Sequence, residues 1–352
     1  MAFMFNLDKL LRENIRSLTP YSSARDEFKG EASIFLDANE NSYGSPLKTA
    51  YNRYPDPRQK RVKEQLSLVK GIPSKNIFLG NGSDEAIDLL FRAFCRPGID
   101  HVITVPPTYG MYEVAARIND IEVKKVKLKA NYQLNLSGID AAINANTKLI
   151  FICSPNNPTG NSINREDIET ILTNFDGLVV VDEAYINYAK QKSLTYELAK
   201  YPNLVVLQTL SKAWGLAGLR LGMAFASEGI IDVLNRIKPP YNISEVSQQL
   251  VLNALEQIDQ VNLWIKEAVL ERELLREALQ SLPFIQAVLP SDANFILVKM
   301  TDSRSVYMYL AEKGIVVRDR SKIELCENCL RITIGTPIEN KTLLTALIDF
   351  NQ

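Results

Sequence analysis

The chain has very little histidine, and that scarcity restricts its chemistry. His101 is the only one among 352 residues, so one chain cannot build a site that needs two histidines, such as an acid-base pair. The four cysteines, Cys95, Cys153, Cys326 and Cys329, include one C-x-x-C spacing but no second pair to complete a structural zinc site. We therefore expect reduced thiols, a structural role for His101 and no bound metal.

An excess of charge and a long apolar run are also missing. The 40 basic residues balance the 41 acidic ones, and the pI is about 6.1. Such a balance favours neither nucleic acid nor an anionic membrane surface as a partner. No apolar run approaches the roughly 20 residues that span a bilayer, and the opening MAFMFNLDKLLREN reaches charge too early for a signal peptide. We expect a cytoplasmic protein.

The chain does contain a regular alternation of two kinds of segment. Short runs rich in valine, isoleucine and leucine alternate with longer stretches of helical period, which is typical of an α/β fold with a mostly parallel sheet between helices. The expected strands are 76–79, 101–105, 148–153, 177–181 and 204–209. Polar residues follow each of them. Because open parallel sheets bind ligands beyond the carboxyl ends of their strands, these polar residues should line one crevice.

The first expected strand ends in a glycine turn that opens a helix. Gly82, Ser83 and Asp84 follow the strand, but position 85 is Glu85, so the third glycine of a dinucleotide-binding motif is missing. The free N–H groups at the start of such a helix bind anions. An ordinary helix capped by Ser83 is the alternative interpretation of the same residues.

Two charged residues stand at the ends of apolar strands. Lys212 closely follows the strand 204–209, where its amine can lose a proton to desolvation and nearby cations and condense with a carbonyl. Asp182 follows the apolar run 177–181, where a carboxylate needs a partner. A protonated pyridine nitrogen would be such a partner. An aldehyde cofactor with a pyridine ring, pyridoxal phosphate, would satisfy both residues.

The motifs SPNNPTG, DEAY and TLSKAWGLAGLRLG occur in this order. They resemble the motifs of the fold-type-I pyridoxal-phosphate-dependent aminotransferases. With LDANENSYG, NRYPDP, NGSDEAIDLLFRAF, PPTYGMY and VVRDRS…CLRITIG added, nearly the whole chain resembles the histidinol-phosphate aminotransferase family. The resemblance implies the fold of that class and pyridoxal 5'-phosphate as cofactor.

The resemblance also implies roles for individual residues. The residues that would contact the cofactor ring are Lys212 as the Schiff base lysine, Asp182 on the pyridine nitrogen, Tyr185 and Asn157 on the ring oxygen, and Tyr109 stacked on the ring face. The residues around the cofactor phosphate would be Gly82, Ser83, Asp84, Thr209, Ser211 and Arg220, with Tyr54 reaching it from a neighbouring subunit. Taken singly, the two tyrosines of the ring site could be core aromatics, Asn157 a turn residue and Arg220 a surface arginine.

Four further residues match the substrate pocket of that family: Tyr21, Asn39, Arg318 and Arg331. The two arginines lie in apolar, strand-like segments separated by a turn, so both could line one side of the pocket. A single arginine there could instead pair with Asp319 or Glu324. Two arginines together match the dianionic phosphate of histidinol phosphate.

The resemblance gives the expected organisation and function. A large cofactor-binding domain would span 45–241, and a smaller α/β domain would combine 1–44 with 242–352. The expected reaction transfers an amino group between histidinol phosphate and 2-oxoglutarate, or glutamate in reverse, in histidine biosynthesis by a homodimer with shared sites. The alternatives are an aromatic amino-acid aminotransferase and an amino-acid phosphate decarboxylase of the same fold. A regulator that senses the cofactor is disfavoured, because no basic face is evident.

Overall fold

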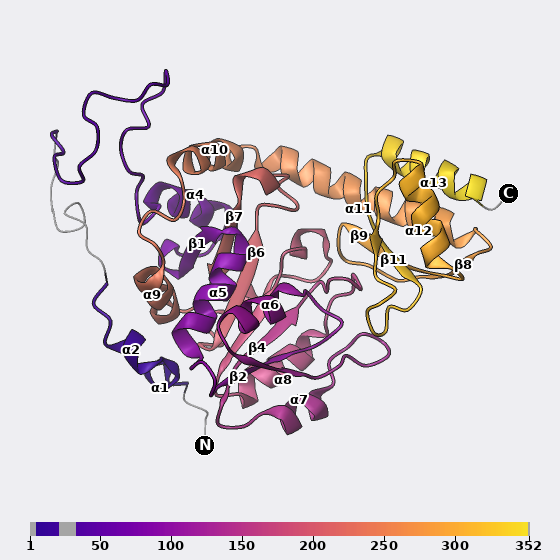
Figure 1. Cartoon of the computed structure of the whole chain (residues 1–352), viewed down its shortest axis with the longest axis horizontal. Helices are drawn as coiled ribbons and strands as arrows, with labels where there is room; N and C mark the ends of the chain where they lie inside the picture. The colour runs from indigo at the N-terminus through magenta and orange to yellow at the C-terminus, as the bar shows by residue number, and fades with distance from the viewer. Residues whose placement is uncertain (1–4, 21–32, 351–352) are drawn as a thin grey trace.

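Two sheets of unequal size organise residues 5–20 and 33–350, which are the residues that the computed structural model describes (Figure 1). The large sheet has the order β1-β7-β6-β5-β4-β2-β3, and its strands are β1 (Ile77–Asn81), β2 (His101–Thr104), β3 (Glu122–Lys125), β4 (Thr147–Cys153), β5 (Leu178–Asp182), β6 (Leu204–Thr209) and β7 (Leu221–Phe225). The small sheet has the order β10-β11-β9-β8, and its strands are β8 (Ile285–Val288), β9 (Phe295–Met300), β10 (Arg318–Asp319) and β11 (Cys329–Thr333).

The large sheet is mostly parallel, as the sequence predicted. Strands β2 to β6 pair in parallel, and only β7 runs antiparallel to its neighbours β1 and β6. All five expected strands are present, with bounds shifted by at most two residues. The pattern did not predict β3, whose residues are charged or only partly buried at the sheet edge, or β7, which follows the glycine-rich segment.

Helices cover both faces of the large sheet. Their bounds are α4 (Lys60–Lys70), α5 (Gly82–Phe94), α6 (Met111–Ile118), α7 (Leu136–Ala142), α8 (Arg165–Asn174), α9 (Glu228–Ile237), α10 (Glu245–Leu255) and α11 (Ile258–Gln280). Alternate strand residues enter two apolar clusters, one with α4, α7, α8 and α10 and the other with α5, α6 and α9. This three-layer arrangement leaves the strand ends open for a site.

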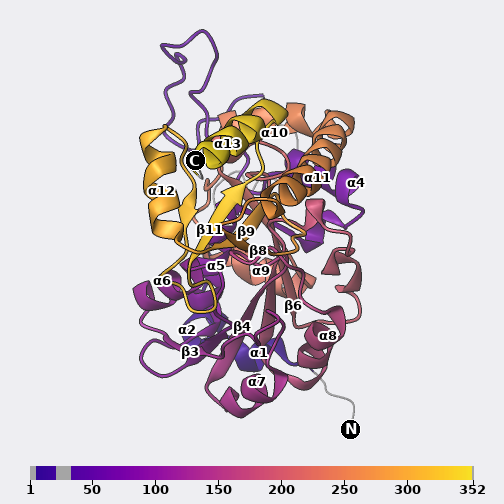
Figure 2. The same ribbon diagram turned by 90° about the vertical axis from the view of Figure 1, so that its right-hand side faces the viewer.

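Helix α11 joins the two sheets (Figure 1). Its Val261 packs in the core of the large sheet, whereas Leu275 and Leu279 pack under the small one. The last two helices, α12 (Ser303–Glu312) and α13 (Pro337–Phe350), complete the small core, and Figure 2 views the molecule from their side. Buried Arg272 on α11 donates to the Ala293 carbonyl at 2.9 Å, which fixes the helix to the loop before β9.

The N-terminal arm packs against the large sheet. It forms two short helices, α1 (Leu7–Leu10) and α2 (Glu13–Arg16), and Leu11 and Ile15 pack in the cluster that contains α5 and α9. The described arm therefore contacts the core of the large sheet. Because residues 21–32 lie outside the described ranges, the division into domains 45–241 and 1–44 with 242–352 stays a prediction.

Residues 33–59 form no helix or strand and extend away from the sheets (Figure 1). Several of their apolar side chains are exposed, including Leu36 and Tyr43. Among the residues that the structure describes, no helix combines the length and apolarity needed to cross a bilayer, and no three acidic, cysteine or histidine side chains gather as metal ligands.

Candidate active site

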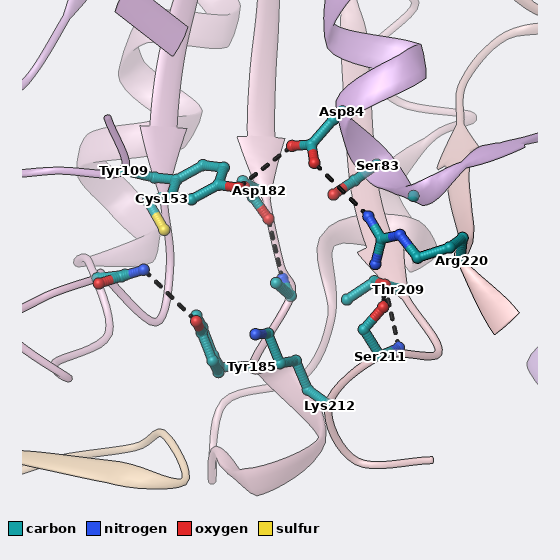
Figure 3. A pocket seen from close by; sticks show the side chains of 13 residues that line it. Ser83, Asp84, Tyr109, Cys153, Asp182, Tyr185, Thr209, Ser211, Lys212 and Arg220 are labelled. Atoms are coloured by element: carbon teal, nitrogen blue, oxygen red, sulfur yellow. Dashed lines mark hydrogen bonds and ion pairs between the residues drawn. The ribbon is translucent and has the colours of Figure 1, made fainter. Parts of the chain in front are cut away.

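A pocket lies at the carboxyl ends of β4, β5 and β6, where the start of α5 and the segment after β6 close it (Figure 3). Its lining residues are Gly82, Ser83, Asp84, Tyr109, Cys153, Asn157, Asp182, Ala184, Tyr185, Thr209, Ser211, Lys212 and Arg220. The structure thus brings together every residue predicted to contact the cofactor except Tyr54. Residues from five separate stretches of chain meet because parallel strands end at one edge of the sheet.

One side of the pocket is suited to an anion. Helix α5 begins at Gly82, and the side chain of the preceding Asn81 caps none of its N–H groups. Ser83 therefore lies inside the helix and does not serve as its cap. The hydroxyls of Thr209 and Ser211 are 3.0 Å apart beside this helix start. A helix start, two hydroxyls and an arginine together form a phosphate-binding arrangement.

The arginine of this anion site is Arg220. Its guanidinium lies 3.9 Å from a carboxylate oxygen of Asp84, and its side chain is 53% exposed. The sequence left open a surface arginine as the alternative for Arg220; the side chain is exposed, but its guanidinium turns toward the pocket (Figure 3). The exposure leaves room for a phosphate beside it.

Two glycines allow the backbone to approach this site closely. A Cβ at Gly222 on β7 would lie 2.1 Å from the Ser83 nitrogen, so any side chain there would displace the start of α5. Gly82 has a φ of +71°, which favours glycine, and its added Cβ would meet the Arg220 guanidinium at 2.8 Å. These glycines shape the space in which the anion would lie.

Asp182 ends β5 as a buried carboxylate with two hydrogen bonds. Tyr112 donates its hydroxyl at 2.7 Å, and the Ala184 N–H donates at 3.0 Å. Burial raises the pKa of Asp182, while these two hydrogen bonds and the charge of Lys212 oppose the rise. A cationic partner inside the pocket would stabilise the ionised carboxylate further.

Lys212 enters the pocket from the segment after β6 (Figure 3). Its Nζ lies 5.6 Å from the centre of the Tyr185 ring. Although part of the side chain is exposed, burial of the amine lowers the pKa of Lys212, and the charges of Arg331 and Arg220 lower it further. Asp182 opposes this effect. A lowered pKa supplies the unprotonated amine that attacks a carbonyl.

The pocket is joined to the small sheet through Tyr185 and Asn157. The Asn157 amide donates to the Tyr185 hydroxyl at 3.4 Å and accepts from the Arg331 guanidinium at 2.5 Å. Arg331 also lies over the Phe295 ring, 5.1 Å from its centre, and Phe295 meets Tyr185 edge to face. The substrate-side arginine therefore contacts the cofactor side of the pocket directly.

Sequence reasoning missed three groups beside the pocket. Tyr112 lies fully buried behind Asp182 and stacks on Phe151, and its place three residues after Tyr109 in PPTYGMY was an available signal. Cys153 and Ala184 also line the pocket. Tyr109 itself donates to Asp84 at 3.2 Å, which aligns its ring at the pocket wall.

A buried polar network lies behind the site. Glu183, next to Asp182 in the chain, accepts from the Leu194 N–H at 2.7 Å and from the Gln208 amide at 3.0 Å. Gln208 accepts in turn from Lys70 of α4 at 2.9 Å. This network ties the turn after β5 to β6. It therefore supports Asp182 and Lys212, the two catalytic candidates, from behind.

The four predicted substrate residues and Tyr54 have different outcomes. Tyr21 lies outside the described residues. Asn39 and Tyr54 belong to the extended 33–59 segment and are not among the pocket's lining residues; Tyr54 stacks on Tyr241 at 4.5 Å. The structure does bring the two arginines together, because Arg318 and Arg331 are directly paired across β10 and β11.

A buried carboxylate, a lysine of lowered pKa and an anion site lie together at the strand ends of a mostly parallel sheet, which is the arrangement expected of a fold-type-I enzyme. The chain belongs to the class I and II aminotransferases, since the family described as "Aminotransferase class I and II" matches residues 36–347. This membership confirms the predicted fold class, the enzyme class and the dependence on pyridoxal phosphate.

Individual relatives agree with this family. A histidinol-phosphate aminotransferase of Cytophaga hutchinsonii is 54% identical over 97% of this chain and 99% of its own length. The solved histidinol-phosphate aminotransferase of Sinorhizobium meliloti, in complex with pyridoxal-5'-phosphate, has a TM-score of 0.79 at 23% identity and covers 89% of each chain. The L-threonine-O-3-phosphate decarboxylase of Porphyromonas gingivalis has a TM-score of 0.73 at 24% identity, over 85% of this chain and 91% of its own. At these identities the two structures support the fold alone.

Proposed function

We propose that this chain transfers an amino group between histidinol phosphate and 2-oxoglutarate, as a step of histidine biosynthesis in the cytoplasm. The Cytophaga hutchinsonii relative bears the name of that activity over nearly the whole chain. The observation that carries the proposal is the contact between Arg331 and Asn157, which places an anion-binding side chain beside the proposed cofactor ring. A phosphorylated donor would reach the lysine and the arginine at once.

The residues of the pocket fit pyridoxal phosphate. The phosphate would lie against the start of α5, Thr209, Ser211 and Arg220, and the pyridine nitrogen would face Asp182. When bound, the cofactor supplies an aldehyde and an electron sink for the bond broken at the substrate's α-carbon. A raised pKa makes a lone Asp182 costly to ionise, so a cationic ring nitrogen would remove an existing free-energy cost.

Lys212 would act as the base and acid of the reaction. Its amine, whose pKa is lowered by burial and by two arginines, would take the proton from the α-carbon and return it to the neighbouring reacting carbon. Tyr185 and Asn157 would orient the ring through its oxygen, and Tyr109 would cover one face. Since these residues hold one another by hydrogen bonds, the site is organised before substrate binds.

We also propose that two copies share each site, with Tyr54 binding the cofactor phosphate of the partner. Tyr54 is half exposed on a segment whose other apolar side chains, such as Ile34 and Leu47, are exposed as well. A partner subunit would cover this surface. Mixing Lys212→Ala subunits with Tyr54→Phe subunits would give hybrids with one intact site, so activity should rise above that of either parent; no rise despite proven subunit exchange would contradict the shared site.

The reaction class is tested by the first half of the turnover. The purified yellow protein is mixed with histidinol phosphate without an acceptor, and the absorbance of the cofactor and the release of carbon dioxide are followed. Transamination predicts bleaching of the yellow band to the amino form of the cofactor without gas, and 2-oxoglutarate should restore the band. For a decarboxylase, the fold of which is similar, an amino-acid phosphate would instead release carbon dioxide.

A further inference from the structure

Arg320 lies on the same face of the small sheet as the two predicted substrate arginines. Arg318 and Arg331 are paired across β10 and β11, and the ladder continues because the Arg320 N–H donates to the Cys329 carbonyl at 2.9 Å. Side chains alternate along a strand, so positions 318 and 320 project from the same face as 329 and 331. Three guanidinium groups therefore share one surface.

This surface is opposite the one that α12 and α13 cover. Leu330 packs in the core beneath those helices. Cys329 packs in a separate small cluster with Leu297, the strand partner of Arg331. Because Arg331 contacts Asn157 from this side, the face with the three arginines turns toward the cofactor pocket.

The acidic residues near Arg320 are engaged elsewhere. Asp319 accepts from the Ser321 N–H at 2.8 Å, and Glu324 forms an ion pair with Lys127. Neither of the two ion-pair partners that the sequence offered as an alternative explanation pairs with Arg318 or Arg331. If Arg318 and Arg331 had only a structural role, we would expect one of them to form an ion pair with Asp319 or Glu324.

The three arginines themselves lack acidic partners among the residues that the structure describes. Within residues 5–20 and 33–350, no ion pair involves Arg318, Arg320 or Arg331. The Nε atoms of Arg320 and Arg331 are buried without a hydrogen-bond partner. Burial and the neighbouring arginines lower the pKa of Arg320 to about 10. This concentration of unpaired, partly desolvated positive charge is suited to an anion of more than one charge.

We propose that Arg320 is a third phosphate-binding residue, which makes the site select a phosphorylated amino donor over one that carries only carboxylates. A carboxylate has two oxygens and one charge, which Arg318 and Arg331 can satisfy. A phosphate dianion offers three oxygens and a second charge, for which the third guanidinium is available. This proposal rests on the proposed function. Within that function, Arg320 would distinguish histidinol phosphate from glutamate.

The test compares two donors in one holoenzyme. In Arg320→Gln, kcat/KM of the half-reaction should fall by about 10- to 100-fold for histidinol phosphate, because one charged hydrogen-bonding group is lost. For glutamate it should fall by less than about threefold, because a carboxylate uses the other two arginines. In the same variant, the inhibition constant for inorganic phosphate should rise by a factor similar to the fall in kcat/KM for histidinol phosphate. Arg320→Lys should recover part of the lost preference.

Lys322→Gln is the matched control, because it removes one positive charge from an exposed neighbour, and it should leave the ratio of the two donors as in the wild type. An equal loss for both donors in Arg320→Gln, or no loss for either, would overturn the assignment. Should that variant fail to fold, Arg320→Lys decides in the same way, with a smaller expected change of the ratio between the donors. If wild-type enzyme treats histidinol phosphate and histidinol alike, the proposed function fails, whereas the inhibition by inorganic phosphate still decides the role of Arg320.

Discussion

The site has a cofactor end, which is the pocket that Asp182 and Lys212 line, and a substrate end, which is the arginine surface of β10 and β11 beside it. The two ends are built differently. At the cofactor end, polar groups already hold one another: Tyr112 donates to Asp182, Tyr109 to Asp84 and Asn157 to Tyr185. At the substrate end, the guanidinium groups share a surface without acidic partners among the described residues. The first end is organised in advance, whereas the second needs a ligand to neutralise its charge. Changes at the first should damage chemistry, and changes at the second should alter selectivity.

The largest effect is expected at Lys212, where one side chain is both the covalent anchor and the proton carrier. Lys212→Ala should reduce turnover by about 10⁴-fold or more for every donor, since the amine is needed whatever the substrate. The cofactor should be retained through its phosphate, but borohydride should no longer attach it to the protein. Lys190→Ala, which changes an exposed lysine, is the control. A trapped link at another lysine in Lys212→Ala would contradict the role.

The next effect concerns Asp182 and separates chemistry from binding at the same end. Asp182→Asn should lower kcat by about 10²- to 10³-fold, because the lost charge matters most when electrons enter the ring. The cofactor dissociation constant should change by about tenfold or less, since the phosphate contacts remain. Tyr112→Phe removes only a hydrogen bond to the same carboxylate and should have a smaller effect. Unchanged turnover in Asp182→Asn would exclude the proposed contact with the pyridine nitrogen.

At the substrate end, Arg331→Lys should affect binding of the donor's anion. The substitution keeps the charge but loses the planar pair of N–H groups and the contact with Asn157. We expect kcat/KM for histidinol phosphate to fall by an amount equivalent to about 1.5–3 kcal/mol. The absorbance of the bound cofactor should stay that of the wild type. A change of that spectrum with no change in donor selectivity would place Arg331 at the cofactor end instead.

The smallest effect is one of stability in the cofactor-free protein. Burial raises the pKa of Asp182 above the model-peptide value of 3.8, so the folded state keeps a proton that the unfolded state has lost. The folded state then binds more protons, and its stability falls as the pH rises from that value through the raised pKa. Asparagine does not titrate, so Asp182→Asn should not lose stability in this way. The Tm of the variant minus the Tm of the wild type should therefore increase by a few degrees, roughly, between acidic and neutral pH. A difference independent of pH would show that burial does not dominate.

Much of the cofactor end could be predicted from the sequence because each part lies in a short motif at the end of an apolar strand. Asp182 follows β5 and Lys212 follows β6 within a few residues, and parallel strands bring such ends together without any knowledge of distant contacts. Tyr112 escaped because its hydrogen bond to Asp182 joins residues far apart in sequence.

The substrate end was harder to predict for the same physical reason. Register across a hairpin decides which side chains share a face, and the sequence alone did not reveal that Arg320 continues the ladder beside Arg318 and Arg331. The direction of the Arg220 side chain could not be predicted either, because neighbours in the chain do not fix where a long side chain turns. The role of Tyr54 depends on a second subunit and stays a prediction.

If the cofactor end performs the chemistry while the arginine surface recognises a phosphate, donors with and without a phosphate should react at different rates. The most direct measurement is kcat/KM of the wild-type half-reaction for histidinol phosphate, histidinol and phenylalanine, each monitored through the loss of the yellow absorbance band. We predict that histidinol phosphate is the best donor, that histidinol is poorer by about 100-fold, equivalent to one or two charged hydrogen bonds, and that phenylalanine is slow but detectable. Equal rates with and without the phosphate, or phenylalanine as the best donor, would contradict the claim and favour an aromatic aminotransferase.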